Sequence, residues 1–90
     1  MQGIYGIRHI ESQRIYVGRA KIIAVRWRAH LKALRAGTHV ARRLQTAWNT
    51  YGESAFEWVV LEETPDLFYL AASEQYFINL YDASNPLTGY

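Results

Sequence analysis

The sequence predicts an α/β (α+β) domain with three short strands and three helices, and three observations support this. Ninety residues suffice for one domain and are too few for two. Half of the residues are hydrophobic and 14% are aromatic, so the chain can form a dense core although it has no cysteine for disulfides. Short runs rich in β-branched residues alternate with longer stretches of helical periodicity. We therefore expect residues 1–90 to form a single domain.

Three segments are expected to form strands. The first runs from Gly3 to Ile10, the second from Arg14 to Gly18, and the third from Ala55 to Leu61. They contain the β-branched and aromatic residues that strands favour.

A two-residue turn at Ser12-Gln13 is expected to join the first two strands. It would place Ile10 opposite Ile15, although Ser-Gln is a poor sequence for a tight hairpin turn. The side chains that would then share one face of the sheet are those of Tyr5, Ile7, His9 and Tyr16.

Two helices are expected between the second and third strands. The first runs from Ile22 to Ala36, with Gly37 as its C-terminal cap. The second runs from about Val40 to Tyr51, with Thr38 as its N-cap residue and Gly52 after its end. The inward residues of the second helix are expected to be Val40, Leu44, Ala47, Trp48 and Tyr51.

The last helix carries Glu74, the most informative single residue. Thr64-Pro65-Asp66 is typical of a helix start, and the helix is expected to end near Tyr81. Its inward stripe is expected to consist of Leu67, Leu70, Ala71, Glu74, Phe77, Ile78 and Tyr81. An unpaired buried carboxylate is very costly. Glu74 is therefore expected either to pair with an arginine such as Arg26 or to face a cleft and bind Mg²⁺.

Other candidate residues allow two interpretations. From propensity alone, Tyr5 and Tyr16 are more simply tyrosines that pack the core, although a phenol in a cleft can position or deprotonate water. His30 and His39 are nine residues apart, which is not the spacing of a helical zinc pair. Each histidine alone is more typical of a surface or capping residue than of a catalyst.

The two halves of the chain carry opposite charge. All ten arginines and lysines precede Trp48, and Glu11 is the one acidic residue among them, so residues 1–48 carry +9. Residues 49–90 contain seven acidic residues and no base, which gives −7. This segregation favours a basic face for a polyanion, which DNA, RNA or an acidic protein would satisfy. The alternative is that the two halves pair with each other in the folded chain.

Several short motifs follow one another along the chain. Gly3-Ile4-Tyr5 comes first, Tyr16-Val17-Gly18 follows eleven residues on, Arg26-Trp27 and His30 lie in the next helix, and Glu74 lies in the last. This ordered set resembles the GIY-YIG nuclease family, in particular the amino-terminal catalytic domains of phage-type intron homing endonucleases. The resemblance covers almost the whole chain. It implies a compact domain in which a small three-stranded sheet is flanked by helices.

The resemblance also implies metal-dependent hydrolysis of DNA phosphodiester bonds. Glu74 would hold one Mg²⁺ or Mn²⁺, and Arg26 would stabilise negative charge on the phosphate. Tyr5 would act as, or position, the general base for the attacking water, with Tyr16 and His30 assisting. The residues that the resemblance makes catalytic or assisting are Tyr5, Tyr16, Arg26, His30, His39 and Glu74.

The implied partner is double-stranded DNA. The basic residues expected to contact it are Arg14, Arg19, Lys21, Arg28, Lys32, Arg35, Arg42 and Arg43. An active-site Asn commonly follows a pair like Gly89-Tyr90 in the family, so we expect a truncated catalytic domain whose target specificity resides in a tethered DNA-binding domain. The alternatives are a catalytically silent nucleic-acid-binding domain on the same scaffold and a self-associating protein-interaction domain.

The expected location is the cytoplasm of a bacterial or phage-infected cell. No membrane segment is expected, because the longest apolar run is six residues.

Overall fold

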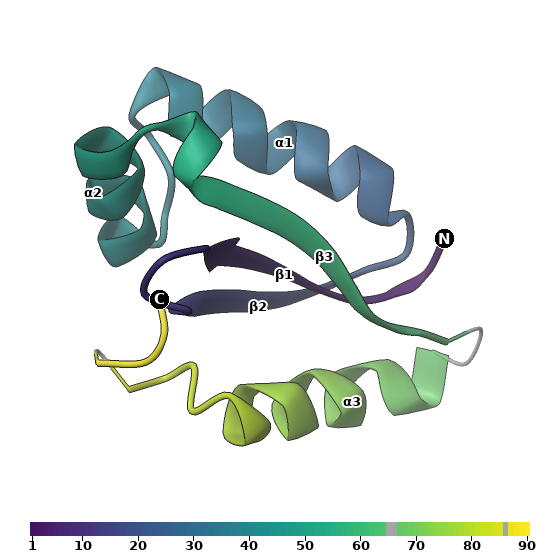
Figure 1. Ribbon diagram of the computed structural model, residues 1–90. Helices are drawn as coiled ribbons and strands as arrows, with labels where there is room; N and C mark the ends of the chain where they lie inside the picture. Colours follow the sequence, from purple (N-terminus) through teal and green to yellow (C-terminus); the bar gives the residue numbers. More distant parts are fainter. Residues whose placement is uncertain (65–66, 86) are drawn as a thin grey trace.

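The computed structural model describes residues 1–64, 67–85 and 87–90 and confirms the predicted α+β class (Figure 1). In chain order the elements are β1 (Gly3–His9), β2 (Ile15–Ala20), α1 (Ile23–Ala36), α2 (Arg42–Tyr51), the short 3₁₀ turn η1 (Glu53–Ala55), β3 (Phe56–Glu63) and α3 (Leu67–Leu80). The strands form an antiparallel sheet in the order β2-β1-β3, so β1 is central and β2 lies at one edge.

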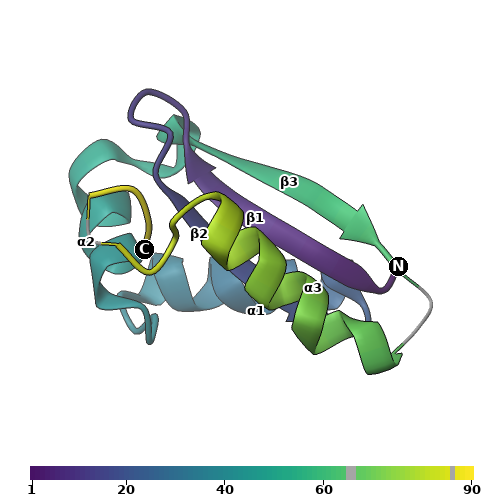
Figure 2. The same ribbon diagram turned by 90° about the horizontal axis from the view of Figure 1, so that it is seen from below.

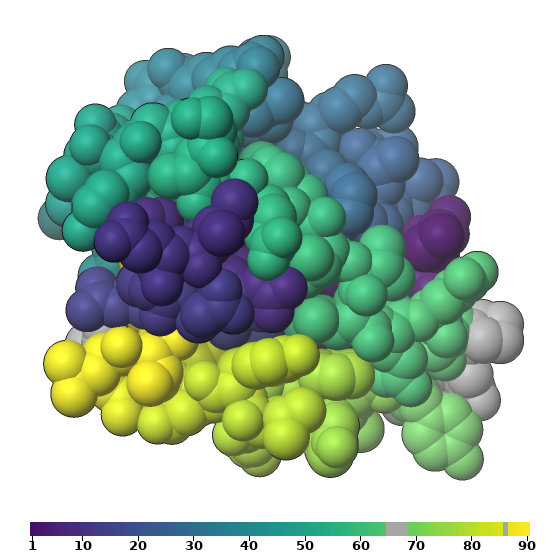
Figure 3. Space-filling view, viewed as in Figure 1, coloured from purple at the N-terminus to yellow at the C-terminus, as the bar shows by residue number. Residues whose placement is uncertain are grey.

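The sheet lies between two helical layers. Helices α1 and α2 cover one face and α3 covers the other, which Figures 1 and 2 show from two directions and Figure 3 shows as three stacked bands. Because side chains of a strand alternate between faces, Ile4 packs toward Leu70 of α3, whereas Ile7 packs toward Leu34 of α1. Tyr5, on the same face as Ile7, packs toward α1 beside Ile23.

The connection between β1 and β2 is longer than predicted. Ile7 lies opposite Tyr16, so the predicted pairing of Ile10 with Ile15 is wrong by two residues. The loop closes because Gln13 adopts a left-handed backbone conformation, with φ of 63°. A slip of two residues keeps each side chain on its face, so Ile7 and Tyr16 share one face as predicted.

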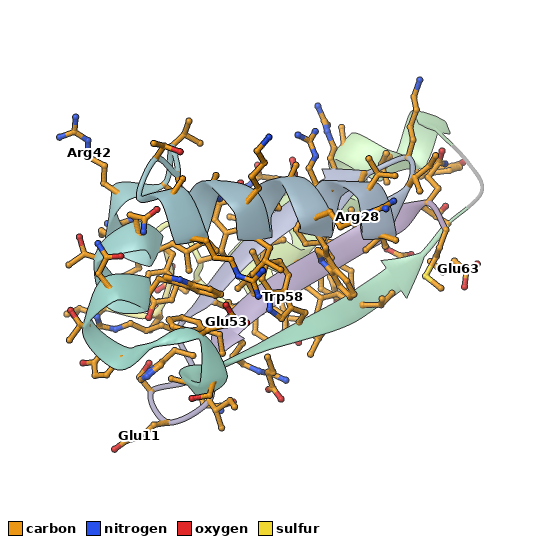
Figure 4. The ribbon with its side chains drawn as sticks, turned by 90° about the horizontal axis from the view of Figure 1, so that it is seen from above. Glu11, Arg28, Arg42, Glu53, Trp58 and Glu63 are labelled. Carbon is orange, nitrogen blue, oxygen red and sulfur yellow. The ribbon has the colours of Figure 1, made fainter. Side chains whose placement is uncertain are left out.

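Helix α1 follows the prediction apart from starting one residue later. Gly37 ends it in the left-handed region, with φ of 76°, and its N–H donates to the Leu34 carbonyl (3.2 Å). Trp27 of α1 meets Trp58 of β3 edge to face, with their ring centroids 5.9 Å apart. Figure 4 shows Trp58 between α1 and β3.

Helix α2 begins after Ala41, two residues later than predicted, and no side chain caps it. Thr38, the expected cap, instead completes the end of α1, where its N–H and its hydroxyl donate to the Ala33 carbonyl (2.9 and 3.4 Å). Val40 is 89% exposed and Tyr51 is exposed as well. The prediction that these two side chains point inward is therefore wrong.

Strand β3 and helix α3 lie close to their predicted positions. Strand β3 starts one residue after the expected Ala55 and extends beyond Leu61 to Glu63. The expected helix start at Pro65-Asp66 lies outside the described residues. Within the described part of α3, Leu70 is buried as predicted, whereas Ala71 is exposed, contrary to prediction. None of the helices, as far as they are described, is long and apolar enough to span a bilayer.

Candidate active site

The phenol of Tyr5 lies where the predicted site residues converge. Its side chain packs against α1, opposite Gly18 of β2, and the residue is only 2% exposed. A methyl group at position 18 would overlap the Tyr5 hydroxyl, so this close approach requires glycine. The glycine of Tyr16-Val17-Gly18 therefore provides the space for the tyrosine of Gly3-Ile4-Tyr5.

Two histidines continue from Tyr5 as a chain of hydrogen bonds. The Tyr5 hydroxyl lies 2.5 Å from Nε2 of His30, and Nδ1 of His30 lies 2.7 Å from Nε2 of His39. The backbone N–H of Ala41 donates to Nδ1 of His39 (3.0 Å). Three elements thus contribute to one line of contacts: β1, α1 and the loop before α2. The expectation that these histidines lie on the surface is wrong, because both are buried.

Both histidines are held in the neutral form near pH 7. Burial, with smaller contributions from the neighbouring His39 and Arg26, lowers the pKa of His30 to about 4. Burial also lowers the pKa of His39. Neutral imidazoles each carry one N–H, so they can act as oriented hydrogen-bond donors and acceptors here.

Tyr16 lies beside the same histidines. Its ring meets His30 at 5.4 Å and His39 at 5.7 Å, edge to face in both contacts. Burial raises the pKa of both tyrosines above the ordinary value, the charge of Glu74 adds to that effect, and the charge of Arg26 opposes it. The phenol of Tyr5 is further disfavoured as an anion by the neighbouring Tyr16.

Arg26 and Glu74 lie on helices that cover opposite faces of the sheet (Figure 1). Arg26 is exposed on α1 and, with Lys21, lines an open hollow of about 450 Å³. The Glu74 side chain on α3 is 26% exposed, and its Oε1 lies 4.0 Å from Nη1 of Arg19 on β2. The charges of Arg26 and Glu74 both act on the pKa of Tyr5, Arg26 lowering it and Glu74 raising it. Glu74 is therefore open to solvent rather than sealed, and its ion-pair contact in the described structure is with Arg19 rather than Arg26.

The donor set suits a hard cation that keeps much of its water. The parts of the chain that the structure describes contain no cluster of three or more His, Cys, Asp or Glu side chains able to hold a metal ion. Mg²⁺, however, commonly takes one or two carboxylates and completes its shell with water and phosphate. A single, partly exposed Glu74 fits that pattern and does not fit a zinc site.

The basic residues predicted to contact DNA are divided among several places. Arg14, Arg42 and Arg43 line one open hollow of about 310 Å³ near α2, and Arg42 projects away from the body in Figure 4. Arg35 is engaged instead in a two-bond contact with Glu53, with both N–O distances 2.9 Å. For Arg35, the alternative that the two halves of the chain pair with each other is thus correct.

The remaining basic candidates lie at the end of β2, just beyond it, and on α1. Arg19 and Lys21 lie at the end of β2 and just beyond it, next to Glu74 and Arg26 as described above. Lys32 is exposed on α1, and Arg28 borders an apolar hollow together with the two packed tryptophans. The uncommitted positive charge is therefore concentrated along α1 and at the start of α2.

Sequence reasoning missed Gln45, which fixes the position of His39. Gln45 is buried in α2, and its Oε1 accepts from the His39 N–H (3.1 Å). Its amide group donates to the Leu34 carbonyl (3.0 Å) and to Asn49 Oδ1 (2.9 Å). A polar residue beside Leu44 on the inward side of a predicted helix is the signal that could have revealed it.

Comparison with known proteins defines the class to which this fold and cluster belong. The family model of the GIY-YIG catalytic domain matches residues 1–88. The chain therefore belongs to the GIY-YIG family and is a nuclease domain.

Individual relatives agree with this assignment. Intron-associated endonuclease 1 of Enterobacteria phage T4 is 41% identical over 63 residues, which are 70% of this chain and 25% of that protein. The solved catalytic domain of homing endonuclease I-TevI matches 100% of this chain and 96% of its own, with 32% identity and a TM-score of 0.92. A glutamate-to-alanine variant of the I-TevI domain matches 99% of this chain and 90% of its own, with 32% identity and a TM-score of 0.88. The chain thus spans a quarter of the curated relative's length.

Proposed function

We propose that this domain hydrolyses phosphodiester bonds of double-stranded DNA with the help of one Mg²⁺ or Mn²⁺ ion, as the catalytic module of a homing-type endonuclease. One observation carries the proposal. A buried phenol, Tyr5, is hydrogen-bonded to His30, and its pKa responds to the guanidinium of Arg26 on α1 and to the carboxylate of Glu74 on α3, which lie on helices covering opposite faces of the sheet. Tyr5, Arg26 and Glu74 are thus our candidates for the base, the cation and the metal ligand that phosphodiester hydrolysis needs.

The Tyr5 phenol has the place of the general base or of the group that orients the attacking water. Burial and Glu74 raise its pKa, so Tyr5 needs positive charge and hydrogen-bond donation in order to ionise. Arg26 supplies part of that charge and can bind a phosphate oxygen through its planar guanidinium. Tyr16 and His30 keep the Tyr5 hydroxyl in position.

Glu74 is the residue that would hold the divalent cation. When bound, the ion would supply positive charge against the phosphate oxygens, where negative charge develops during hydrolysis. The partial exposure of Glu74 gives such an ion access to water and to substrate.

The substrate surface combines the cluster with the nearby basic residues. Lys21 and Arg26 line the hollow beside the site, and Arg14, Arg42 and Arg43 line the hollow near α2, so we assign these side chains to contacts with DNA phosphates. Such contacts carry little sequence information. Since the T4 relative is four times longer than the matched part, a separate DNA-binding domain would supply target specificity, and the cytoplasm of a phage-infected cell is the corresponding location.

The test is a supercoiled-plasmid nicking assay with Mg²⁺ or Mn²⁺ and with EDTA. We expect cleavage by the native chain that EDTA abolishes, and a loss of at least a hundredfold in Glu74→Ala. The matched control is Glu63→Ala, which removes an exposed carboxylate of β3 and should cut normally. DNA binding by fluorescence anisotropy should persist in Glu74→Ala, because the basic residues remain. Normal cleavage by Glu74→Ala would refute the assignment, and binding without any cleavage by the native chain would indicate the silent nucleic-acid binder.

A further inference from the structure

The backbone N–H of Ala41 fixes the direction of every hydrogen bond between α2 and the catalytic phenol. This N–H lies at the N-cap of α2 and points at Nδ1 of His39 (3.0 Å). A backbone N–H can only donate, so Nδ1 of His39 must be the acceptor and carry no proton. Neutral His39 therefore carries its proton on Nε2, which donates to Nδ1 of His30 (2.7 Å).

The same reasoning continues to Tyr5. Since Nδ1 of His30 accepts, neutral His30 carries its proton on Nε2, which faces the Tyr5 hydroxyl at 2.5 Å. We propose that His39 is a positioning residue which holds His30 as a fixed donor to the Tyr5 oxygen, so that the phenol proton points away from the histidines. This inference rests on the proposed function of Tyr5 and goes beyond it by assigning both tautomers and the direction of proton loss.

The reverse direction is incompatible with the geometry. If Tyr5 donated to His30, His30 would have to donate from Nδ1 to Nε2 of His39. His39 would then carry its proton on Nδ1, where the N–H of Ala41 already points. An added proton on His39 would lie on Nδ1, against the N–H of Ala41. An added proton on His30 would lie on its Nδ1, against the N–H at Nε2 of His39. The arrangement thus excludes His30 as the base that takes the phenol proton.

The consequence for reactivity concerns the phenolate. If a water molecule takes the Tyr5 proton on the side away from His30, the phenol oxygen keeps the hydrogen bond from His30 Nε2, and that bond strengthens as the oxygen becomes negative. No proton moves along the histidines, so His30 and His39 stay neutral throughout. Gln45 accepts a hydrogen bond from the backbone N–H of His39 and holds that residue in place. Ala41, at the N-cap of α2, fixes the orientation of the His39 ring relative to His30.

The direct test is the tautomeric state of the histidines in the full chain. Long-range ¹H–¹⁵N NMR spectra of the ¹⁵N-histidine-labelled protein at pH 7 should show His30 and His39 as Nε2–H tautomers, each with an unprotonated Nδ1. An Nδ1–H tautomer or an imidazolium at either residue would overturn the inference. This measurement needs no substrate or metal, so it is independent of whether the domain cleaves DNA.

Two substitutions at His39 give a second test with a functional readout. The amide of His39→Gln can place an N–H near the position of Nε2, whereas His39→Leu has no donor. We expect cleavage to fall at least tenfold in His39→Leu and to recover most of that loss in His39→Gln, because a wrong tautomer next to a catalytic group is costly. An equal loss of cleavage in both variants would show that His39 itself transfers a proton. Full cleavage by both variants would show that His39 has no role. Either result overturns the proposal.

Proline at position 41 removes the donor from which the chain of contacts starts. Ala41 has φ of −80°, which proline can adopt. In Ala41→Pro, we expect an Nδ1–H signal to appear at His39, while the exposed neighbour variant Val40→Ala leaves both tautomers unchanged. Unchanged tautomers in a folded Ala41→Pro protein would contradict the assignment.

Discussion

Protonation of His30 should make the stability of this domain depend on pH in a calculable way. The pKa of His30 is lowered from 6.5 to about 4 by burial, by His39 and by Arg26. Above pH 6.5 the ring is neutral in both the folded and the unfolded chain and contributes no pH dependence. Between pH 6.5 and about 4 only the unfolded chain takes up the proton, so stability falls as the pH falls.

The size of this effect follows from the shift. Lowering the pKa of His30 from 6.5 to about 4 corresponds to about 3 kcal/mol, and partial solvent screening reduces the expected loss to about 2 kcal/mol. That loss is a large fraction of the ~5–15 kcal/mol by which small domains are stable.

The assay is urea unfolding of the native chain and of His30→Gln between pH 7.5 and 4. Carboxylates titrate in both proteins, so the difference between their free energies of unfolding isolates His30. The native chain should lose about 2 kcal/mol more than the variant over this range, which is a shift of roughly 1–2 M in the urea midpoint. Parallel pH profiles of the two proteins would refute the buried, neutral state of His30.

Three further predictions concern other residues. Arg26→Ala should lower turnover by at least a hundredfold in the nicking assay, whereas Arg35→Ala, whose guanidinium is engaged with Glu53, should change it little; equal effects would indicate general electrostatics only. Gly18→Ala should cost about 1–3 kcal/mol in thermal unfolding and lower cleavage, because the added methyl displaces the Tyr5 ring; a variant of native stability and activity would contradict the close packing. Replacing Arg42 and Arg43 together by alanine should weaken DNA binding and reduce the slope of log Kd against log salt by about 1–2, and an unchanged slope would exclude them as phosphate contacts.

The elements were largely predictable because each has a local signal. The left-handed Gly37 ends α1 where predicted, and the β-branched strand segments are found within one or two residues of their expected bounds. The hairpin register was not predictable, since Gln13 takes a positive φ that its residue type does not favour. The start of α2 was also misplaced, because Thr38 can serve equally as a cap or as the end of the preceding helix, and tertiary contacts decide between the two.

The site was predictable as a set of residues and not as a network. Glu74 stands out because a charge falls within an apolar stripe, and the structure shows it partly exposed. By contrast, His30 and His39 have no spacing that signals a contact, because their hydrogen bond depends on how the loop before α2 folds back onto α1. A backbone donor such as the N–H of Ala41 leaves no trace in the sequence at all.

The burial of Tyr5 creates a conflict that explains why the site is divided between two helical layers. The ring is part of the core against α1, and the same burial raises the pKa of the phenol, so that little of it is ionised and available as a base. Stability therefore opposes reactivity at this residue, and the compensation must come from charges that stay outside the core. The charge of Arg26 on α1 already lowers the pKa of Tyr5. The charge of Glu74 on α3 raises it, unless a cation neutralises the carboxylate. A carboxylate that hinders the base when it is free and helps it when it holds Mg²⁺ would make cleavage depend on the metal even before the phosphate is considered. Tyr5 should accordingly ionise at a lower pH in the presence of Mg²⁺ in the native chain and not in Glu74→Gln, which ultraviolet titration of the tyrosines, with Tyr5→Phe as the reference, can measure.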